Sequence, residues 1–267
     1  SQVAVVTSTN VGALNSDQVS VLSTAQLSTL GTGQVKSITT SAVAAMTTTQ
    51  VAALSTTQVA ALTTVQMAAL TANEVKTFST TQVQALGSTQ INALTNANVS
   101  ALTTGQVAAL TTGQVNALTT SAVSALGTAQ VQALSTGQVQ AITTTNVTAL
   151  STTQVAALTT GQVSALSTSQ VVALETSDIA ALSTTQVGAL TTAQVNVLST
   201  DKVAALSTGQ VAVLTTAQVQ ALTTSNVASL STSQLQVLSS DQVAAFSTAQ
   251  VSALTTTEAA TLSAGQA

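Results

Sequence analysis

Several residue types on which enzymes and binding proteins depend are missing from this sequence. It contains no cysteine, histidine, proline, tryptophan or tyrosine, and its three basic residues are the lysines Lys36, Lys76 and Lys202. Without cysteine there is no disulfide framework and no thiolate metal site. Without histidine, and with lysines far apart in the sequence, the many Ser and Thr hydroxyls have no nearby base to activate them. The sequence therefore predicts no catalytic, cofactor-binding or metal-binding residue, and a protein that is not an enzyme.

Charge and long apolar runs are equally scarce. Charged residues make up 4% of the chain, with three basic against seven acidic groups, which cannot supply the basic surface of a nucleic-acid-binding protein. The mean hydropathy is +0.49, but apolar runs stop at about four residues, as at positions 59–62, where a membrane span needs about 18. The first residues also lack the pattern of a signal peptide. We expect no membrane span and no nucleic-acid partner.

What the chain does contain is a repeat of eight residues. From Val3 to Gln266 it reads as 33 octads without insertion or deletion, with the unit Val-x-Ala-Leu-[Ser/Thr]-Thr-x-Gln, numbered here as positions 1 to 8. Departures at position 1 are Leu27, Met67, Ile91, Ile179, Leu235 and Ala259, and those at position 4 include Ile38, Met46, Phe78, Ile142 and Phe246. Met46 and Met67 thus fall at core positions, where methionine fills gaps.

The distribution of fixed and variable positions favours a helix. At about 100° per residue, positions 1, 4 and 8 share one side of a helix and the variable positions 2 and 7 share the other. A strand would place position 7 on the same face as the fixed valine and alanine. In addition, Ser55 can act as an N-cap and Gln58 can reach back to its amide, while Leu54 and Val59 can close a hydrophobic staple. Position 5 is Ser, Thr, Asn or Gly in every octad except at Glu175, and all four are good N-caps.

The acidic residues give an independent indication of helices. They fall at positions 5, 7 and 8, which are the cap and first turn of the expected helix, where its dipole favours negative charge. These residues are Asp17, Glu74, Glu175, Asp178, Asp201, Asp241 and Glu258. Lys202, at position 8, departs from this pattern.

Two observations favour strands instead. Seven of the twelve glycines occupy position 7, and glycine costs about 1 kcal/mol inside a helix relative to alanine. Threonine and valine also favour strands. The predicted fold is therefore an all-α solenoid of very short capped helices, one per octad, with a β-solenoid carrying Thr and Gln ladders as the alternative.

A single octad cannot fold alone. It buries about three apolar side chains, worth roughly 3–6 kcal/mol, while ordering eight residues costs about 12 kcal/mol. We therefore expect one solenoid over residues 1–267, stabilised by contacts between neighbouring repeats and acting as a monomer, while the sequence leaves the number of octads per turn open. Because both ends fall within an octad, the sequence reads as a segment of a longer array.

Two small groups of residues could carry chemistry. Glu175 and Asp178 are the one pair of close carboxylates, and capping is the favoured interpretation for both. Asn98-Val99-Ser100 and Asn146-Val147-Thr148 match the N-glycosylation pattern, although Asn at position 8 also replaces the capping Gln.

The stretch Gln-Val-Ala-Ala-Leu-Thr-Thr at residues 106–112 resembles octad arrays of very large bacterial surface, adhesin-like or haem-utilisation proteins. The haem label finds no axial ligand here. The resemblance implies an extracellular or cell-surface location and a stalk or spacer function. The alternative function is binding of ice or a surface polymer through an array of threonines, which requires the flat β-solenoid. A designed array is a third possibility.

Overall fold

Each octad forms one short helix. In this computed structural model, which describes residues 6–262 and residue 266, there are 32 helices of four to six residues and no strand. Every helix begins at position 6 and ends between positions 1 and 3. The predicted all-α solenoid is confirmed, and for the described residues the β-solenoid alternative is wrong.

The helices fall into two compact units, Ser1–Ile142 and Thr143–Ala267. The helices of the first unit are α1 (Ser8–Gly12), α2 (Ser16–Ser20), α3 (Thr24–Ser28), α4 (Thr32–Ser37), α5 (Thr40–Val43), α6 (Thr48–Ala52), α7 (Thr56–Ala61), α8 (Thr64–Ala69), α9 (Ala72–Val75), α10 (Thr80–Ala85), α11 (Ser88–Asn92), α12 (Asn96–Ala101), α13 (Thr104–Ala109), α14 (Thr112–Asn116), α15 (Thr120–Ser124), α16 (Thr128–Gln132) and α17 (Thr136–Ala141). Those of the second unit are α18 (Thr144–Val147), α19 (Thr152–Ala156), α20 (Thr160–Ala165), α21 (Thr168–Ala173), α22 (Thr176–Ala181), α23 (Thr184–Gly188), α24 (Thr192–Asn196), α25 (Thr200–Ala204), α26 (Thr208–Ala212), α27 (Thr216–Ala221), α28 (Thr224–Ala228), α29 (Thr232–Gln236), α30 (Ser240–Ala244), α31 (Thr248–Ala253) and α32 (Thr256–Thr261).

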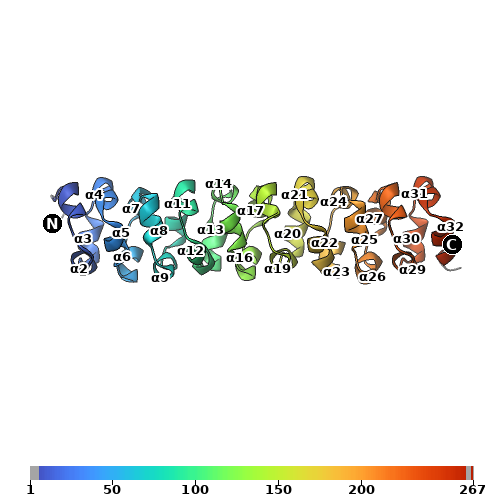
Figure 1. The fold of residues 1–267 in the computed structure, drawn as a ribbon, viewed down its shortest axis with the longest axis horizontal. Coiled ribbons are helices and arrows are strands. Elements are labelled where there is room, and N and C mark those ends of the chain that lie inside the picture. Colours follow the sequence, from blue (N-terminus) through green and yellow to red (C-terminus); the bar gives the residue numbers. More distant parts are fainter. Residues whose placement is uncertain (1–5, 263–265, 267) are drawn as a thin grey trace. The chain divides into compact units, whose positions relative to one another are not determined.

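Within each unit, every helix packs against the helices three places before and after it. In the first unit α1, α4, α7 and α10 pack in one series, and α2, α5, α8 and α11 pack in the next. Figure 1 shows α4 beside α7 and α5 beside α8. In the second unit α19, α22, α25, α28 and α31 stack in the same way. Three octads therefore make one turn of the solenoid, and equivalent residues of adjacent turns are separated by three octads of sequence.

The predicted caps begin these helices. The backbone amide of Gln58 donates to Ser55 Oγ at 3.1 Å, and the backbone amide of Ser55 donates to Gln58 Oε1 at 2.9 Å. The same reciprocal pair begins most of the other helices. A helix this short makes few internal hydrogen bonds, so satisfying its end groups decides whether it forms.

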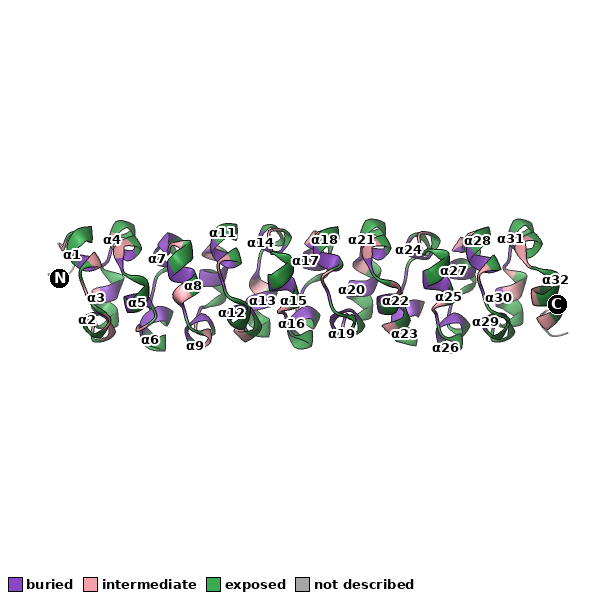
Figure 2. Cartoon of the chain, in the orientation of Figure 1, coloured by how far each residue is buried: buried purple, intermediate pink, exposed green. Residues whose placement is uncertain are grey.

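The core lies along the inner side of the helices (Figure 2). Position 1 and position 4 are buried throughout the interior turns, including both Met46 and Met67. Position 8 is buried as well, in spite of its polar side chain. The exposed positions are 2, 5, 6 and 7, so the outer surface is made mostly of Ser, Thr, Ala, Asn and Gly.

The position-7 glycines lie in the first helical turn without a special backbone conformation. All described glycines have negative φ, and a Cβ built at Gly105 or Gly113 meets nothing closer than 3.9 Å. Replacing Gly105 and Gly113 by alanine is expected to raise the free energy of unfolding by roughly 0.5–1 kcal/mol each, measured by urea denaturation. Gly12→Ala is the contrasting variant, because its Cβ would lie 3.1 Å from the Ser37 carbonyl oxygen. An equal gain at Gly12 would contradict the explanation.

Candidate functional site

The most distinctive polar feature of the molecule is the buried side chain at position 8. Gln82, which is 4% exposed, shows its geometry. Its Oε1 accepts from the Ser79 backbone amide at 2.6 Å. Its Nε2 donates to the carbonyl oxygen of Leu54 at 2.6 Å and to that of Ala52 at 3.3 Å, one turn below. One amide group thus caps its own helix and binds the end of another.

This arrangement recurs along both units and is called here the glutamine ladder. Each member donates to a position-4 carbonyl 28 residues earlier, at 2.5–2.9 Å, and many also reach a position-1 carbonyl 31 residues earlier. Its members include Gln34, Gln50, Gln58, Gln66, Gln82, Gln90, Gln106, Gln114, Gln130 and Gln138 in the first unit, and Gln186, Gln194, Gln210, Gln218, Gln234, Gln242, Gln250 and Gln266 in the second.

The ladder solves a problem that very short helices create. The last carbonyl groups of a helix have no partner within the helix, and here they are buried between two turns. A buried polar group left without a hydrogen bond costs about 1–3 kcal/mol. The glutamines of the next turn donate hydrogen bonds to these carbonyls. Packing one turn on another therefore provides hydrogen-bond partners for the helix ends and at the same time buries the apolar core.

A second set of bonds between turns comes from position 2, which the sequence predicts to be solvent-facing. Asn92 Nδ2 donates to the Ala117 carbonyl at 2.7 Å, and Asn116 Nδ2 donates to that of Ala141 at 3.1 Å. Both side chains are exposed, and each reaches a residue 25 places later. The sequence does not predict these contacts, because position 2 varies in residue type.

Three charged residues that replace the usual residues of the repeat, Glu175, Asp178 and Lys202, lie close together in the second unit. Lys202 replaces the ladder glutamine and is 7% exposed, and its Nζ donates to the carbonyls of Val171 and Val172 at 3.2 and 2.7 Å. Burial lowers the pKa of Lys202, while the charges of Glu175 and Asp178 oppose that shift. Asp178 occupies position 8 one turn below and accepts from the Glu175 backbone amide at 3.0 Å.

Asp178 therefore caps its helix, as predicted, whereas Glu175 occupies the N-cap position without a side-chain cap hydrogen bond. The charges of both act on the pKa of the buried lysine. The close carboxylates and the one lysine at position 8 form a charge-compensated step in the ladder. The sequence contains the signal for this grouping, because Asp178 and Lys202 hold the same octad position three octads apart, the length of one turn.

The energetic link between Asp178 and Lys202 can be measured with a double-mutant cycle. Lys202→Gln restores the ladder amide and its bond to the Ser199 backbone amide, and is expected to stabilise the fold by roughly 1 kcal/mol. Combined with Asp178→Asn, its effect should depart from additivity by roughly 0.5–1 kcal/mol. Urea denaturation gives each free energy of unfolding. Lys202→Gln with Asp17→Asn, in the other unit, is the additive control. Additivity in the first pair would show that the two charges do not interact.

Glu74 is another ladder position without an amide. It is 2% exposed, and its Oε2 accepts from the Thr71 backbone amide at 2.5 Å. Its second carboxylate oxygen takes the place of the Nε2 group of a ladder glutamine. In Gln58 that group donates to carbonyls one turn below. Burial raises the pKa of Glu74, and the hydrogen bonds from Thr71 oppose the shift. A protonated Glu74 has the donor that the ladder requires.

The stability of the array should accordingly depend on pH through Glu74. Because its pKa is higher in the folded than in the unfolded chain, its favourable contribution is complete below the unfolded pKa and is lost as the pH rises through the folded pKa. Glu74→Gln is expected to stabilise the fold by roughly 1–3 kcal/mol at neutral pH and by much less in acid. Denaturation over a pH series measures this. The exposed Asp17→Asn should change little at either end, and an equal gain for Glu74→Gln at all pH values would refute the explanation.

The other residues singled out in the sequence have structural surroundings. Asn98 and Asn146 are both buried, and Asn98 Nδ2 donates to the Leu70 carbonyl at 2.9 Å, so neither is available to a glycosylating enzyme in the folded chain. Across the described residues, no group of three or more acidic, histidine or cysteine side chains could hold a metal ion. No described helix is long and apolar enough to cross a membrane.

Comparison with known proteins identifies the repeat. No curated protein gives a significant match to the chain. The ALTTAQ repeat, in contrast, matches eight times, at residues 28–64, 64–96, 92–120, 107–144, 136–168, 171–208, 203–232 and 224–256. These matches cover well over half of the sequence and run through both units, so the chain belongs to the ALTTAQ repeat family.

Proposed function

We propose that this chain is a structural spacer, a stalk segment of a large extracellular bacterial surface protein, and that it performs no catalysis. The observation that carries the proposal is the glutamine ladder. Its buried polar side chains bind helix ends of the same chain, so they are occupied in closing one turn on the next.

The exposed surface supports the same role. It is made of small neutral side chains at positions 2, 5, 6 and 7, with charged residues forming 4% of the sequence. Such a surface attracts neither nucleic acid nor ions. A repeat array of this kind changes length simply by changing its number of turns, which suits a segment that sets a distance.

Binding of ice or a polymer lattice is not supported in the same way. That function depends on a flat β-solenoid, and the described residues form helices only. The position-6 threonines instead start separate helices, as Thr56, Thr104 and Thr208 do.

The spacer role is tested by length. Variants carrying one or two additional turns of three octads each, inserted after an octad boundary, should increase the maximum dimension in small-angle X-ray scattering by the same increment each time. An insertion of equal length but shuffled octad sequence is the control. Absence of a constant increment would exclude a spacer.

The location is tested separately, on the cells that produce the protein. Antibodies against the array should label intact cells, and protease added outside should remove the label. Labelling only after the cells are opened would overturn the extracellular part of the proposal while leaving the spacer role standing.

A further inference from the structure

The buried carboxylates of the ladder differ in how their charge is balanced. Asp178 and Glu74 both hold position 8, and both are 2% exposed. Asp178 lies near Lys202, which carries the opposite charge. Among the described residues Glu74 has no such partner, because α6 and α12, which pack against α9, contain no charged residue, and Lys76, the C-cap of α9, is exposed. A buried charge without a partner is unfavourable, so an ionised Glu74 requires a cation beside it.

The carbonyl oxygens one turn below a ladder position form a small cluster, called here the carbonyl site. The Nε2 group of Gln66 lies 2.8 Å from the Val35 carbonyl oxygen, 31 residues earlier. It also lies 3.4 and 2.7 Å from those of Lys36 and Ile38, which are 30 and 28 residues earlier. Gln50 repeats these three offsets at 2.9, 3.1 and 2.7 Å. Each carbonyl site therefore directs up to three oxygen acceptors at one point.

Lys202 shows that a carbonyl site accepts a positive charge as well as an amide. Its Nζ donates to the carbonyl oxygens of Val171 and Val172 at 3.2 and 2.7 Å. These residues are 31 and 30 places earlier, the same offsets as those of the glutamines. The oxygen ends of the carbonyl dipoles thus stabilise an ammonium group at this position.

Glu74 brings a carboxylate to a carbonyl site of the same kind. At the ladder offsets the site consists of the carbonyl groups of Val43, Ala44 and Met46. No donor among the described residues reaches the carbonyl oxygen of Met46. Glu74 Oε2 accepts from the Thr71 backbone amide at 2.5 Å, and the other carboxylate oxygen takes the place of Nε2. Because an ionised carboxylate has no hydrogen to donate, only oxygen acceptors meet at this point.

We propose that Glu74 and its carbonyl site bind a hard metal cation, Ca²⁺ or Na⁺, between two turns of the solenoid. Carboxylate and backbone carbonyl oxygens are the ligands that such cations take. At Gln66 the ladder group and the carbonyl oxygens lie 2.7–3.4 Å apart. That is the separation of neighbouring ligands that each stand about 2.3–2.6 Å from one Ca²⁺ ion. Mg²⁺ fits poorly, because it demands near-octahedral geometry and gives up its waters reluctantly.

This site departs from the prediction that the chain has no metal-binding residue. Most of its ligands are backbone carbonyls from another turn, and no spacing of side chains in the sequence reveals them. The inference is independent of the spacer role, since a stalk can hold its length with or without the ion.

Thermal unfolding of the parent chain, followed by circular dichroism at neutral pH and constant ionic strength, tests the site in CaCl₂, NaCl, MgCl₂ and choline chloride. The midpoint should rise by roughly 3–10 °C at about 10 mM CaCl₂ if the dissociation constant is about 10⁻⁴–10⁻³ M. A rise in CaCl₂ alone identifies Ca²⁺ as the ion, and an equal rise in NaCl identifies a site for monovalent cations.

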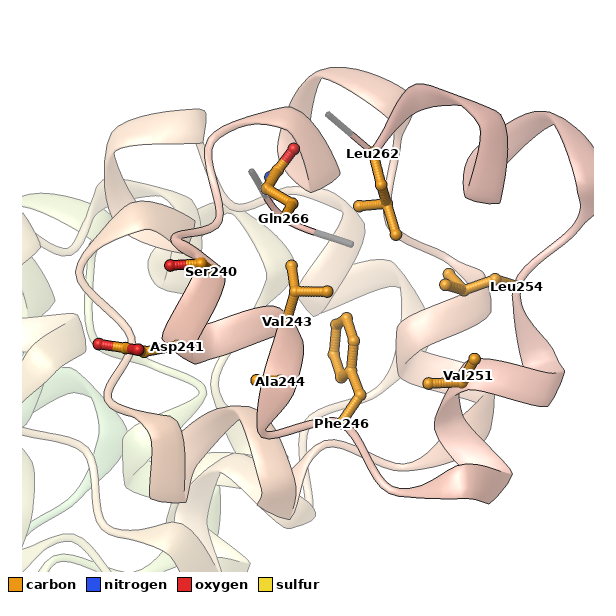
Figure 3. A pocket seen from close by; sticks show the side chains of 9 residues that line it. All are labelled: Ser240, Asp241, Val243, Ala244, Phe246, Val251, Leu254, Leu262 and Gln266. Atoms are coloured by element: carbon orange, nitrogen blue, oxygen red, sulfur yellow. The ribbon is translucent and has the colours of Figure 1, made fainter. Parts of the chain in front are cut away.

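Two variants locate the ion. Glu74→Gln replaces the carboxylate by the usual amide and should unfold at one temperature in all four salts, so its gain in stability over the parent should shrink in the salt that binds. Asp241→Asn is the matched control, because Asp241 is exposed and its carboxylate points away from the neighbouring apolar side chains (Figure 3). It should respond to the salts as the parent does.

A third variant builds a second site. Gln114→Glu places a carboxylate at the carbonyl site of Val83, Gln84 and Leu86, whose oxygens Gln114 Nε2 reaches at 2.8, 3.5 and 2.8 Å. Equilibrium dialysis should show one bound ion in the parent, two in Gln114→Glu and none in Glu74→Gln. The proposal is overturned if the parent unfolds alike in every salt, if MgCl₂ is as effective as CaCl₂, or if Glu74→Gln still binds the ion.

Discussion

Replacing Gln82 by alanine is expected to lower the free energy of unfolding by roughly 2–4 kcal/mol, because several buried polar groups lose their partner at once. The Ser79 amide loses its acceptor, and the carbonyls of Leu54 and Ala52 lose their donor. The site is 4% exposed, so water cannot replace the missing amide without opening the contact between turns.

Gln84 provides the matched control, two residues away. It is the same residue type in the same helix, α10, but it is exposed at position 2. Gln84→Ala should change the free energy of unfolding by less than about 0.5 kcal/mol, measured by the same urea denaturation. Gln82→Glu separates the two roles, since it keeps the cap acceptor and loses the donor to the turn below. Equal effects at the two glutamines would show that the ladder does not stabilise the fold.

The local structure could be predicted from the sequence because each octad contains the residues that cap its own helix and the residues that become its buried face. The hydroxyl of Ser55 and the amide of Gln58 are three residues apart, and that spacing alone specifies a reciprocal cap. Val59 and Leu62 fall on one side of the resulting helix and become core. Glycine at position 7 pointed toward strands, but in the first turn its cost is small compared with the capped end and the packed face.

The contacts between turns could not be predicted, because no residue pattern within one octad specifies which other octad packs against it. The sequence did contain a clue. A cap at position 8 would be served well by glutamate, whose charge the helix dipole favours, yet 23 of the 33 position-8 residues are Gln and two are Glu. Preference for the neutral amide means that its N–H groups are needed as well as its oxygen. The structure shows their acceptors one turn below.

The same reasoning explains the substitutions that looked irregular. Asn98 is shorter than glutamine but retains an N–H donor, and it binds the carbonyl 28 residues earlier, at Leu70. Lys202 retains donors but gives up the cap acceptor. Asn98 and Lys202 each depart from the repeat sequence. Both nevertheless occupy a ladder position and donate to carbonyls one solenoid turn below, so each replaces glutamine in that role.

Removing residues 107–110 is expected to cost far more stability than removing residues 107–114, although the second deletion is twice as long. Loss of a whole octad keeps every later glutamine at the ladder spacing from a position-4 carbonyl. Loss of half an octad breaks that spacing for the turn that follows. Gln114 and Gln130 would then face position-8 carbonyls in place of those of Leu86 and Leu102, to which they now donate at 2.8 and 2.7 Å.

Gln138 is affected by the half-octad deletion as well, because its acceptor, the Leu110 carbonyl, is removed. This deletion should therefore reduce the free energy of unfolding by roughly 4–8 kcal/mol, from the lost ladder bonds and one misaligned layer of core. The octad deletion should cost roughly 1–3 kcal/mol, because it removes one unit from an otherwise continuous stack. Thermal unfolding followed by circular dichroism compares the two, and hydrogen exchange should place the weakened region of the shorter deletion around residues 99–138. If four and eight missing residues were tolerated equally well, the turns would not be held in register by the glutamines, and the stability of the array would have to come from the apolar core alone.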